Sequence, residues 1–251
     1  MVQKPHEHGF VVVVPAAGVG KRMQANCPKQ YLTIHGKPIL AHTVDRLLSH
    51  PKIEKVILSL GKNDQYFAES NLAEYSNIIR VDGGKERVDS VLNGLRAIDA
   101  DKYPWVLVHD AARPCVQLSD IDKLISKCLA LDSGGLLASP VRDTMKRGEV
   151  TKESVNSVCH TVQREQLWHA LTPQLYKTQQ LLDSIESALA KHIEITDESS
   201  AIEQAGLSSL LVSSSHENIK ITHPDDLALA AFILTKQGAQ QLNTKQCKEL
   251  Q

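Results

Sequence analysis

The chain reads Val12-Val13-Val14-Pro15-Ala16-Ala17-Gly18-Val19-Gly20-Lys21-Arg22-Met23 near its start, and Cys27-Pro28-Lys29-Gln30-Tyr31 follows a few residues later. The valines predict a buried β-strand, because a short apolar run bounded by turn residues is typical of one. Small residues after the strand let the backbone approach a ligand, and the cations Lys21, Arg22 and Lys29 suit a polyphosphate. The segment therefore predicts a nucleoside triphosphate site.

Two better-known glycine loops do not fit this segment. A Walker A loop needs Ser or Thr after its lysine, whereas Arg22 follows Lys21. A dinucleotide-binding fingerprint needs Gly or Ala at its third position, where this chain has Met23. An ordinary strand-to-helix turn with solvated cations remains the alternative for the isolated segment, since glycine commonly marks turns.

Composition excludes several classes of protein. The chain has 251 residues, 42% of them hydrophobic, which is enough to bury the core of one α/β domain over residues 1–236. A net charge of -1 and 4% aromatic residues argue against a nucleic-acid partner. The five cysteines are scattered and odd in number, which favours a reducing cytoplasm. The first nine residues lack an apolar signal core, and no apolar run approaches the length of a membrane span.

Apolar runs and helical patterns alternate along the chain. Strands are expected at residues 10–15, 52–60, 77–81, 105–109, 134–140, 209–212 and 218–222. Helices are expected at residues 38–48, 87–98, 119–131 with Ser119 as cap, 179–191, 197–205 and 224–235. Such alternation predicts a mainly parallel sheet with ligands at the carboxyl ends of its strands, where Pro15 and Asp110 fall. The polar tail at residues 237–251 is expected to fray.

Residues 141–163 interrupt this alternation. They turn at Arg147-Gly148-Glu149 and return through residues 155–162, which predicts a β-hairpin too polar to form a hydrophobic core by itself. Isolated hairpins are marginally stable, so the segment either lies against something else or forms a solvated flap.

Several blocks together resemble one family of nucleotidyltransferases. Besides residues 15–23 and 28–31, the blocks are Asp82-Gly83-Gly84-Lys85-Glu86-Arg87 with Ser90, His109-Asp110-Ala111-Ala112-Arg113-Pro114, Pro140-Val141-Arg142-Asp143-Thr144-Met145-Lys146, Leu171-Thr172-Pro173-Gln174, Thr196-Asp197-Glu198-Ser199 and Asn218-Ile219-Lys220. Their order is similar to that of the cytidylyltransferases that act on 2-C-methyl-D-erythritol 4-phosphate. The resemblance covers about residues 10–235 and implies a Rossmann-like three-layer nucleotidyltransferase fold, with the hairpin as an arm that crosses to a second subunit. A homodimer is implied in the same way.

The resemblance also implies roles for residues. Arg22 and Lys29 would stabilise the α-phosphorus and the departing pyrophosphate, while Arg164 and Lys220 position the polyol phosphate. The nucleotide site would comprise Ala16, Ala17, Gly18, Gly20, Gly83, Gly84, Lys85, Ser90, Asp110 and Ala111. The polyol phosphate pocket would comprise Arg113, Thr144, Arg164, Thr172, Thr196 and Lys220, with Thr144 and Arg164 from the neighbouring subunit. Lys85 stands where some relatives have an acid, so a side-chain role there is open.

Three further interpretations follow from the same residues. Asp110 is expected to orient the ribose or the second substrate, or to contact Mg²⁺ directly or through water. His109 is expected to support its loop rather than to catalyse. Lys220 is expected on a short apolar strand, where an unpaired buried charge would be costly and a phosphate partner is plausible.

The implied activity is transfer of the CMP moiety of CTP to 2-C-methyl-D-erythritol 4-phosphate. A phosphate monoester has a second pKa of about 6, so it is largely dianionic at neutral pH and needs no general base. Neutralisation and alignment by cations and Mg²⁺ are therefore the main tasks. Three alternatives stay open: a ribitol 5-phosphate cytidylyltransferase, a non-catalytic nucleotide sensor of the same fold, and a Rossmann dehydrogenase, which Met23 disfavours.

Overall fold

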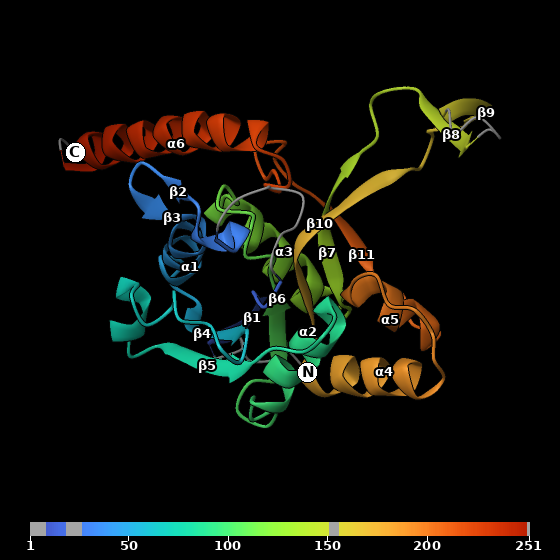
Figure 1. Cartoon of the computed structure of the whole chain (residues 1–251), viewed down its shortest axis with the longest axis horizontal. Helices are drawn as coiled ribbons and strands as arrows, with labels where there is room; N and C mark the ends of the chain where they lie inside the picture. The colour runs from blue at the N-terminus through green and yellow to red at the C-terminus, as the bar shows by residue number, and fades with distance from the viewer. Residues whose placement is uncertain (1–8, 19–26, 151–155, 250–251) are drawn as a thin grey trace.

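The computed structural model describes residues 9–18, 27–150 and 156–249, with a seven-stranded sheet at its centre (Figure 1). The strand order is β11-β7-β10-β6-β1-β4-β5, and β10 alone runs antiparallel to its neighbours. The strands are β1 (Phe10–Pro15), β4 (Ile53–Leu60), β5 (Ile78–Asp82), β6 (Trp105–Val108), β7 (Gly135–Pro140), β10 (Trp168–Lys177) and β11 (Leu210–Ser213). The predicted mainly parallel sheet is thereby confirmed.

Helices cover both faces of this sheet. They are α1 (Ile39–Leu48), α2 (Arg87–Arg96), α3 (Leu118–Ala130), α4 (Thr178–Ala190), α5 (Glu198–Gln204) and α6 (Asp225–Glu249). Val12 and Val14 of β1 share a core cluster with α1 and α3, whereas Val11 and Val13 share another with α2, α4 and α5. Successive side chains of a strand point to opposite faces, so the valines are buried under helices on both faces of the sheet. The fold therefore has the expected three layers.

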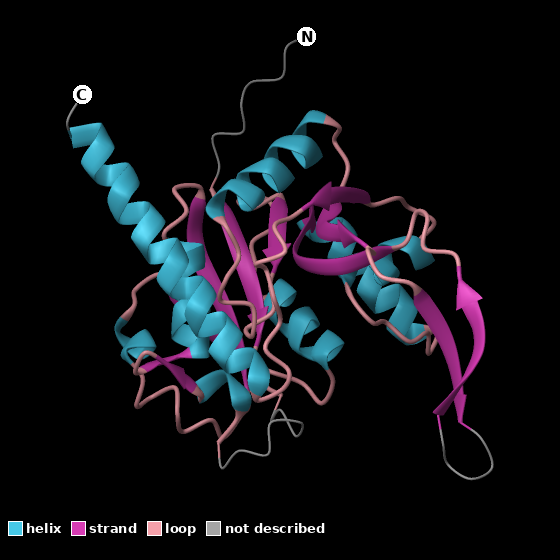
Figure 2. Ribbon diagram, turned by 90° about the horizontal axis from the view of Figure 1, so that it is seen from above, coloured by secondary structure: helices cyan, strands magenta, loops and turns pink. Residues whose placement is uncertain are grey.

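Two small elements sit beside the main sheet. Strands β2 (Thr33–Ile34) and β3 (Lys37–Pro38) form a ribbon under α6, and the 3-10 turns η2 (Lys29–Tyr31) and η3 (Asn71–Glu74) follow β1 and precede β5 respectively. The predicted hairpin is also confirmed: β8 (Met145–Val150) pairs antiparallel with β9 (Asn156–Val162) and projects away from the body (Figure 2). Val150 and Val158 on it are 71% and 62% exposed.

Two predictions about strands are wrong. The ten-residue strand β10 was not expected, although it fills the sheet position between β6 and β7. Residues 218–222, expected to be a strand, have no strand partner, and Ile221 N–H bonds only to the carbonyl of Ala112 in the adjacent loop. An apolar run alone does not make a strand, because a strand needs a neighbour along its length.

Two predictions about helix ends are also wrong. The N-cap of α3 is Gln117 rather than Ser119. Residues 237–249 continue α6 instead of fraying, because the segment has four Gln and two Lys residues, which favour helix, and because Gln237 is only 5% exposed. Among the described helices, none combines the length and apolar character that crossing a membrane requires.

Candidate active site

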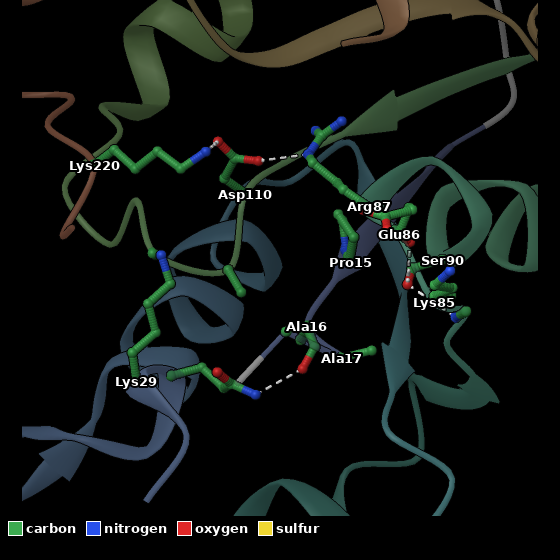
Figure 3. Close-up of a pocket in the computed structure, with 15 residues that line it drawn as sticks. Pro15, Ala16, Ala17, Lys29, Lys85, Glu86, Arg87, Ser90, Asp110 and Lys220 are labelled. Atoms are coloured by element: carbon green, nitrogen blue, oxygen red, sulfur yellow. Dashed lines mark hydrogen bonds and ion pairs between the residues drawn. The ribbon is translucent and has the colours of Figure 1, made fainter. Parts of the chain in front are cut away.

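A cavity of about 190 Å³ opens at the carboxyl ends of β1 and β6, as expected for ligands of a parallel sheet (Figure 3). The end of β1, the loop after β6 and the N-terminal end of α2 form its walls, and Lys29 and Lys220 reach it from the opposite side. The predicted site residues that line it are Ala16, Ala17, Gly18, Lys29, Gly84, Lys85, Ser90, Asp110, Ala111 and Lys220. Segments far apart in sequence therefore meet around one cavity.

The turn η2, which carries Lys29, is tied directly to the loop at residues 16–18, the expected nucleotide loop. Gln30 is 3% exposed, and its Nε2 donates to the carbonyl of Ala16 at 2.7 Å. Ala16 N–H in turn donates to Ser59 of β4, which fixes the loop to the sheet. Lys29 Nζ donates to the carbonyl of Ile221 at 3.2 Å, beside the segment that carries Lys220. The buried side-chain amide of Gln30 thus fixes the backbone position from which the Lys29 side chain extends.

The turn before α2 is compact for reasons internal to the chain. A Cβ on Gly83 would lie 2.3 Å from Cβ of Ala17, so Gly83 packs under the nucleotide loop and does not line the cavity. Gly84 does line it, and its N–H donates to Ser90 Oγ at 3.0 Å. A Cβ on Gly84 would lie 2.1 Å from Cβ of Asp89. Both glycines are therefore required by close packing, whatever ligand binds beside them.

Asp110 is the electrostatic centre of the site. Its side chain is 9% exposed, and its oxygens lie 3.1 Å from Arg87 Nε, 3.4 Å from Arg113 Nε and 2.8 Å from Lys220 Nζ. Burial by itself would raise the pKa of Asp110, but these three cations outweigh it and hold the pKa well below its usual range. Asp110 is therefore a permanent carboxylate. Lys220 is 37% exposed and pairs with Asp110, so its charge is neither buried nor without a partner in the protein, and the phosphate partner stays a prediction.

Behind Asp110 lies a buried hydrogen-bond chain. Asp110 N–H donates to Thr172 Oγ1 at 3.0 Å, Thr172 Oγ1 lies 3.0 Å from His109 Nδ1, and His109 Nε2 lies 3.0 Å from the carbonyl of Arg113. Since a carbonyl can only accept, Nε2 carries the proton and Nδ1 accepts from the hydroxyl. Burial lowers the pKa of His109 to about 4. His109 supports the loop, as expected, whereas Arg113 and Thr172 brace the site from behind and do not line the cavity.

Other predicted site residues lie outside this cavity. Thr144 and Arg164 are exposed beside the hairpin, where Arg164 donates to the carbonyl of Arg142. Thr196 is exposed just before α5. None of these three lines the cavity of its own chain. Gly20 and Arg22 lie outside the described residues.

Residues that the sequence interpretation missed complete the walls. Gln30, Glu86, Arg87 and Ala112 line the cavity, and Glu198 stands behind Arg87. Arg87 and Glu198 both fall in blocks of the family resemblance, which was the one available signal. Their pairing joins residues 111 positions apart, which spacing alone does not reveal.

The surroundings of Asp110 bear on the expected magnesium contact. Both oxygens of Asp110 are in ion pairs, so a magnesium ion bound there would share the carboxylate with Arg87, Arg113 and Lys220. Over the described part of the chain, no group of three or more His, Cys, Asp and Glu residues could hold a metal ion. Contact between Asp110 and Mg²⁺, direct or through water, therefore stays a prediction.

Comparison with known proteins identifies the family. The family model of 2-C-methyl-D-erythritol 4-phosphate cytidylyltransferase (IspD) matches residues 10–236. A protein of that name from Colwellia psychrerythraea is 69% identical over 91% of this chain and 96% of its own length, and one from Vibrio parahaemolyticus is 56% identical over 90% and 96%. The Francisella tularensis crystal structure of the same name aligns with a TM-score of 0.75 at 34% identity, covering 90% of this chain and 99% of that one. The chain belongs to the 2-C-methyl-D-erythritol 4-phosphate cytidylyltransferase family.

Proposed function

We propose that this chain transfers the CMP moiety of CTP to 2-C-methyl-D-erythritol 4-phosphate, giving 4-diphosphocytidyl-2-C-methyl-D-erythritol and pyrophosphate. Family membership supports the reaction and its substrates. The structural observation that carries it is the meeting of Lys29, Lys220 and the loop at residues 16–18 around one cavity. The comparisons do not favour a ribitol 5-phosphate enzyme, a nucleotide sensor or a dehydrogenase, because the named relatives all act on 2-C-methyl-D-erythritol 4-phosphate.

Charge decides how the site would work. The attacking phosphate is a dianion and the nucleotide is a tetra-anion, so bringing them together requires cations already fixed in place. Lys29 reaches the cavity next to the backbone of residues 16–18, where the triphosphate would lie. Lys220 lies on the same side of the cavity as Lys29 and pairs with Asp110, where the polyol phosphate would approach. Arg22, by family resemblance, would join Lys29 at the α-phosphorus.

The base would lie at the start of α2. Gly84 and Ser90 line that end of the cavity, with Lys85 at its rim. The ten-residue helix α2 begins at Arg87, so its positive end faces the same space and favours the anionic nucleotide. The small residues Gly84 and Ser90 would admit a pyrimidine more readily than a larger purine. Asp110 and Ala111 would border the ribose.

The arm would complete the site of a second subunit. Thr144 and Arg164 do not line the cavity of their own chain, although the resemblance assigns both to the polyol phosphate pocket. A hairpin with exposed Val150 and Val158 has apolar surface to cover. A homodimer in which each arm reaches the neighbouring pocket accounts for both observations, with Arg113, Thr172 and Thr196 on the receiving side.

Magnesium would enter with the nucleotide. Mg²⁺ prefers octahedral oxygen ligands, keeps several waters and commonly binds substrate phosphates, so the triphosphate and water would hold it without displacing a cation from Asp110. When bound there, it would supply further neutralisation of phosphate charge. A cytoplasmic location is supported by the cysteines: Cys27, Cys115, Cys128 and Cys159 are all free thiols among the described residues.

Pyrophosphate release tests this function. The protein should release pyrophosphate with CTP, Mg²⁺ and 2-C-methyl-D-erythritol 4-phosphate, more slowly when ATP replaces CTP, and more slowly with ribitol 5-phosphate. Omitting the polyol phosphate is the control for simple CTP hydrolysis. Equal rates with ribitol 5-phosphate would reassign the substrate, and binding of CTP without release would favour a sensor.

A further inference from the structure

A buried ion pair stands behind the cavity at Arg87. Arg87 Nη1 and Nη2 donate to the two oxygens of Glu198 at 2.7 and 3.2 Å, while Arg87 Nε donates to Asp110 Oδ1 at 3.1 Å. The Glu198 side chain is 2% exposed and does not line the cavity, whereas that of Arg87 is 30% exposed and does. One planar guanidinium therefore connects a hidden carboxylate to a carboxylate of the site. Figure 3 shows its contact with Asp110.

This pairing fixes Arg87 more firmly than Asp110 alone could. A bidentate contact restrains both the position and the plane of a guanidinium. Burial alone would lower the pKa of Arg87, but Glu198 first and then Asp110 overcome it and raise the pKa above its ordinary value. Asp110 also pairs with Lys220, so the chain Glu198–Arg87–Asp110–Lys220 runs from the first turn of α5 to the cation expected at the polyol phosphate.

Glu198 also limits the charge of the cluster. Arg87, Arg113 and Lys220 bring three positive charges, and Asp110 and Glu198 bring two negative charges, which leaves a net charge of +1. Without Glu198 the net charge would be +2, and Arg87 would be held only by Asp110. A triphosphate would then attract Arg87 out of its present position, because nothing behind the guanidinium opposes that movement.

We propose that Glu198 is a positioning residue that acts through Arg87 to fix Asp110, and with it Lys220, for the transfer step. The inference rests on the proposed function and adds to it a residue that touches neither substrate. Removing Glu198 should weaken stabilisation of the transition state, because Arg87, Asp110 and Lys220 would be positioned less precisely. Binding of CTP should stay intact, because the net positive charge of the cavity would rise.

The test compares Glu198→Gln with Glu186→Gln. Glu186 on α4 accepts from Arg96 of α2, with both side chains about half exposed, so its replacement removes the same charge from another ion pair of α2, away from the site. We expect kcat to fall about ten- to a hundredfold in Glu198→Gln, as for a displacement of about 1 Å at a catalytic group. The CTP dissociation constant should stay within about threefold of the wild type or tighten. Glu186→Gln should keep both values within about twofold.

Calorimetric titration with CTP counts the folded sites, so kcat is expressed per binding site and unfolded protein does not enter it. If Glu198→Gln gives no soluble protein, Glu198→Asp decides: a several-fold lower kcat per site supports the proposal, and wild-type kcat overturns it. Wild-type kcat in Glu198→Gln, or a loss confined to CTP affinity, overturns it too. Failure of the wild-type protein to release pyrophosphate would instead remove the proposed function.

The variant Arg87→Met provides a second test. If Glu198 acts through Arg87, adding Glu198→Gln to Arg87→Met should change kcat per site by less than about twofold, because the connection is already broken. The double variant should also have a higher thermal midpoint than Arg87→Met, because Glu198→Gln removes a buried carboxylate that has lost its partner. If kcat of the double variant instead falls by the product of the two factors measured for the single variants, the proposal is overturned.

Discussion

The buried imidazole of His109 makes stability depend on pH in a way that the geometry specifies. His109 has no exposed surface, and its two ring nitrogens face Thr172 Oγ1 and the carbonyl of Arg113. A second proton on Nδ1 would confront a hydroxyl that already donates there, and the charge would be buried. The unfolded chain meets no such penalty, so acid favours unfolding through this residue.

The size of the effect follows from the pKa. Burial lowers the pKa of His109 in the folded protein to about 4, against 6.5 for an ordinary histidine. The folded pKa is the lower one, so the stabilising contribution is complete above pH 6.5 and is lost as pH falls from there toward 4. Each pKa unit corresponds to about 1.4 kcal/mol, which gives a loss of roughly 2 to 3 kcal/mol between neutral pH and about pH 4.5.

His109→Gln removes the titration, and His216→Gln removes an exposed imidazole as the control. Urea unfolding of each variant and of the wild type should be measured near pH 7 and near pH 4.5. At neutral pH His109→Gln should be the less stable protein. Its deficit should shrink by roughly 2 to 3 kcal/mol in acid, and His216→Gln shows what replacing a histidine at an exposed position does by itself. A deficit for His109→Gln that is independent of pH would refute the assigned tautomer and its depressed pKa.

Three further outcomes are expected. Lys29→Ala should lower turnover about a thousandfold, because an ion pair at about 4 Å with an effective dielectric near 20 contributes about 4 kcal/mol; more than a tenth of wild-type turnover would remove Lys29 from the transition state. Mixed dimers of Lys29→Ala with Arg164→Ala should recover about a quarter of wild-type activity, because half the dimers are mixed and each has one intact site of two. If the activity stays at the level of the two single variants, the arm and the nucleotide loop serve the active site of the same chain. Gln237→Ala should lower the free energy of unfolding by about 1 to 3 kcal/mol, since the carbonyl of Cys115 loses a buried hydrogen bond and Arg46 and Glu217 lose part-buried ones; an unchanged urea midpoint would contradict this.

Much of the fold could be predicted because local patterns and tertiary burial agree. The four valines at residues 11–14 are nearly completely buried on both faces, as a central parallel strand requires. The cavity likewise forms at the ends of β1 and β6, where the sheet rule places it. Each of these predictions depends on residues close together in sequence, which is why pattern reasoning reaches them.

The remaining errors concern partners that are distant in sequence. Strand β10 contains Thr172 and Pro173 and carries mixed polar and apolar residues, so only its neighbours β6 and β7 make it a strand. Residues 218–222 have the apolar pattern without the neighbours. In the middle of α6, Gln237 is buried where it donates to the carbonyl of Cys115 and accepts from Arg46. No local pattern predicts such contacts.

The position of Asp110 shows why a site for anions needs an acid. Three cations gathered around one cavity repel each other, and long side chains would turn outward to water before any substrate arrived. Asp110 holds Arg87 and Lys220 at its two oxygens, so their positions are set in the free protein. A phosphate approaching Lys220 then meets an aligned ammonium group that is 37% exposed and needs little movement to bind. Preorganisation of this kind lowers the barrier because the charges are oriented before the reaction and do not have to reorganise during it. Glu198 extends the same arrangement one step deeper, by fixing the guanidinium against which Asp110 itself is held.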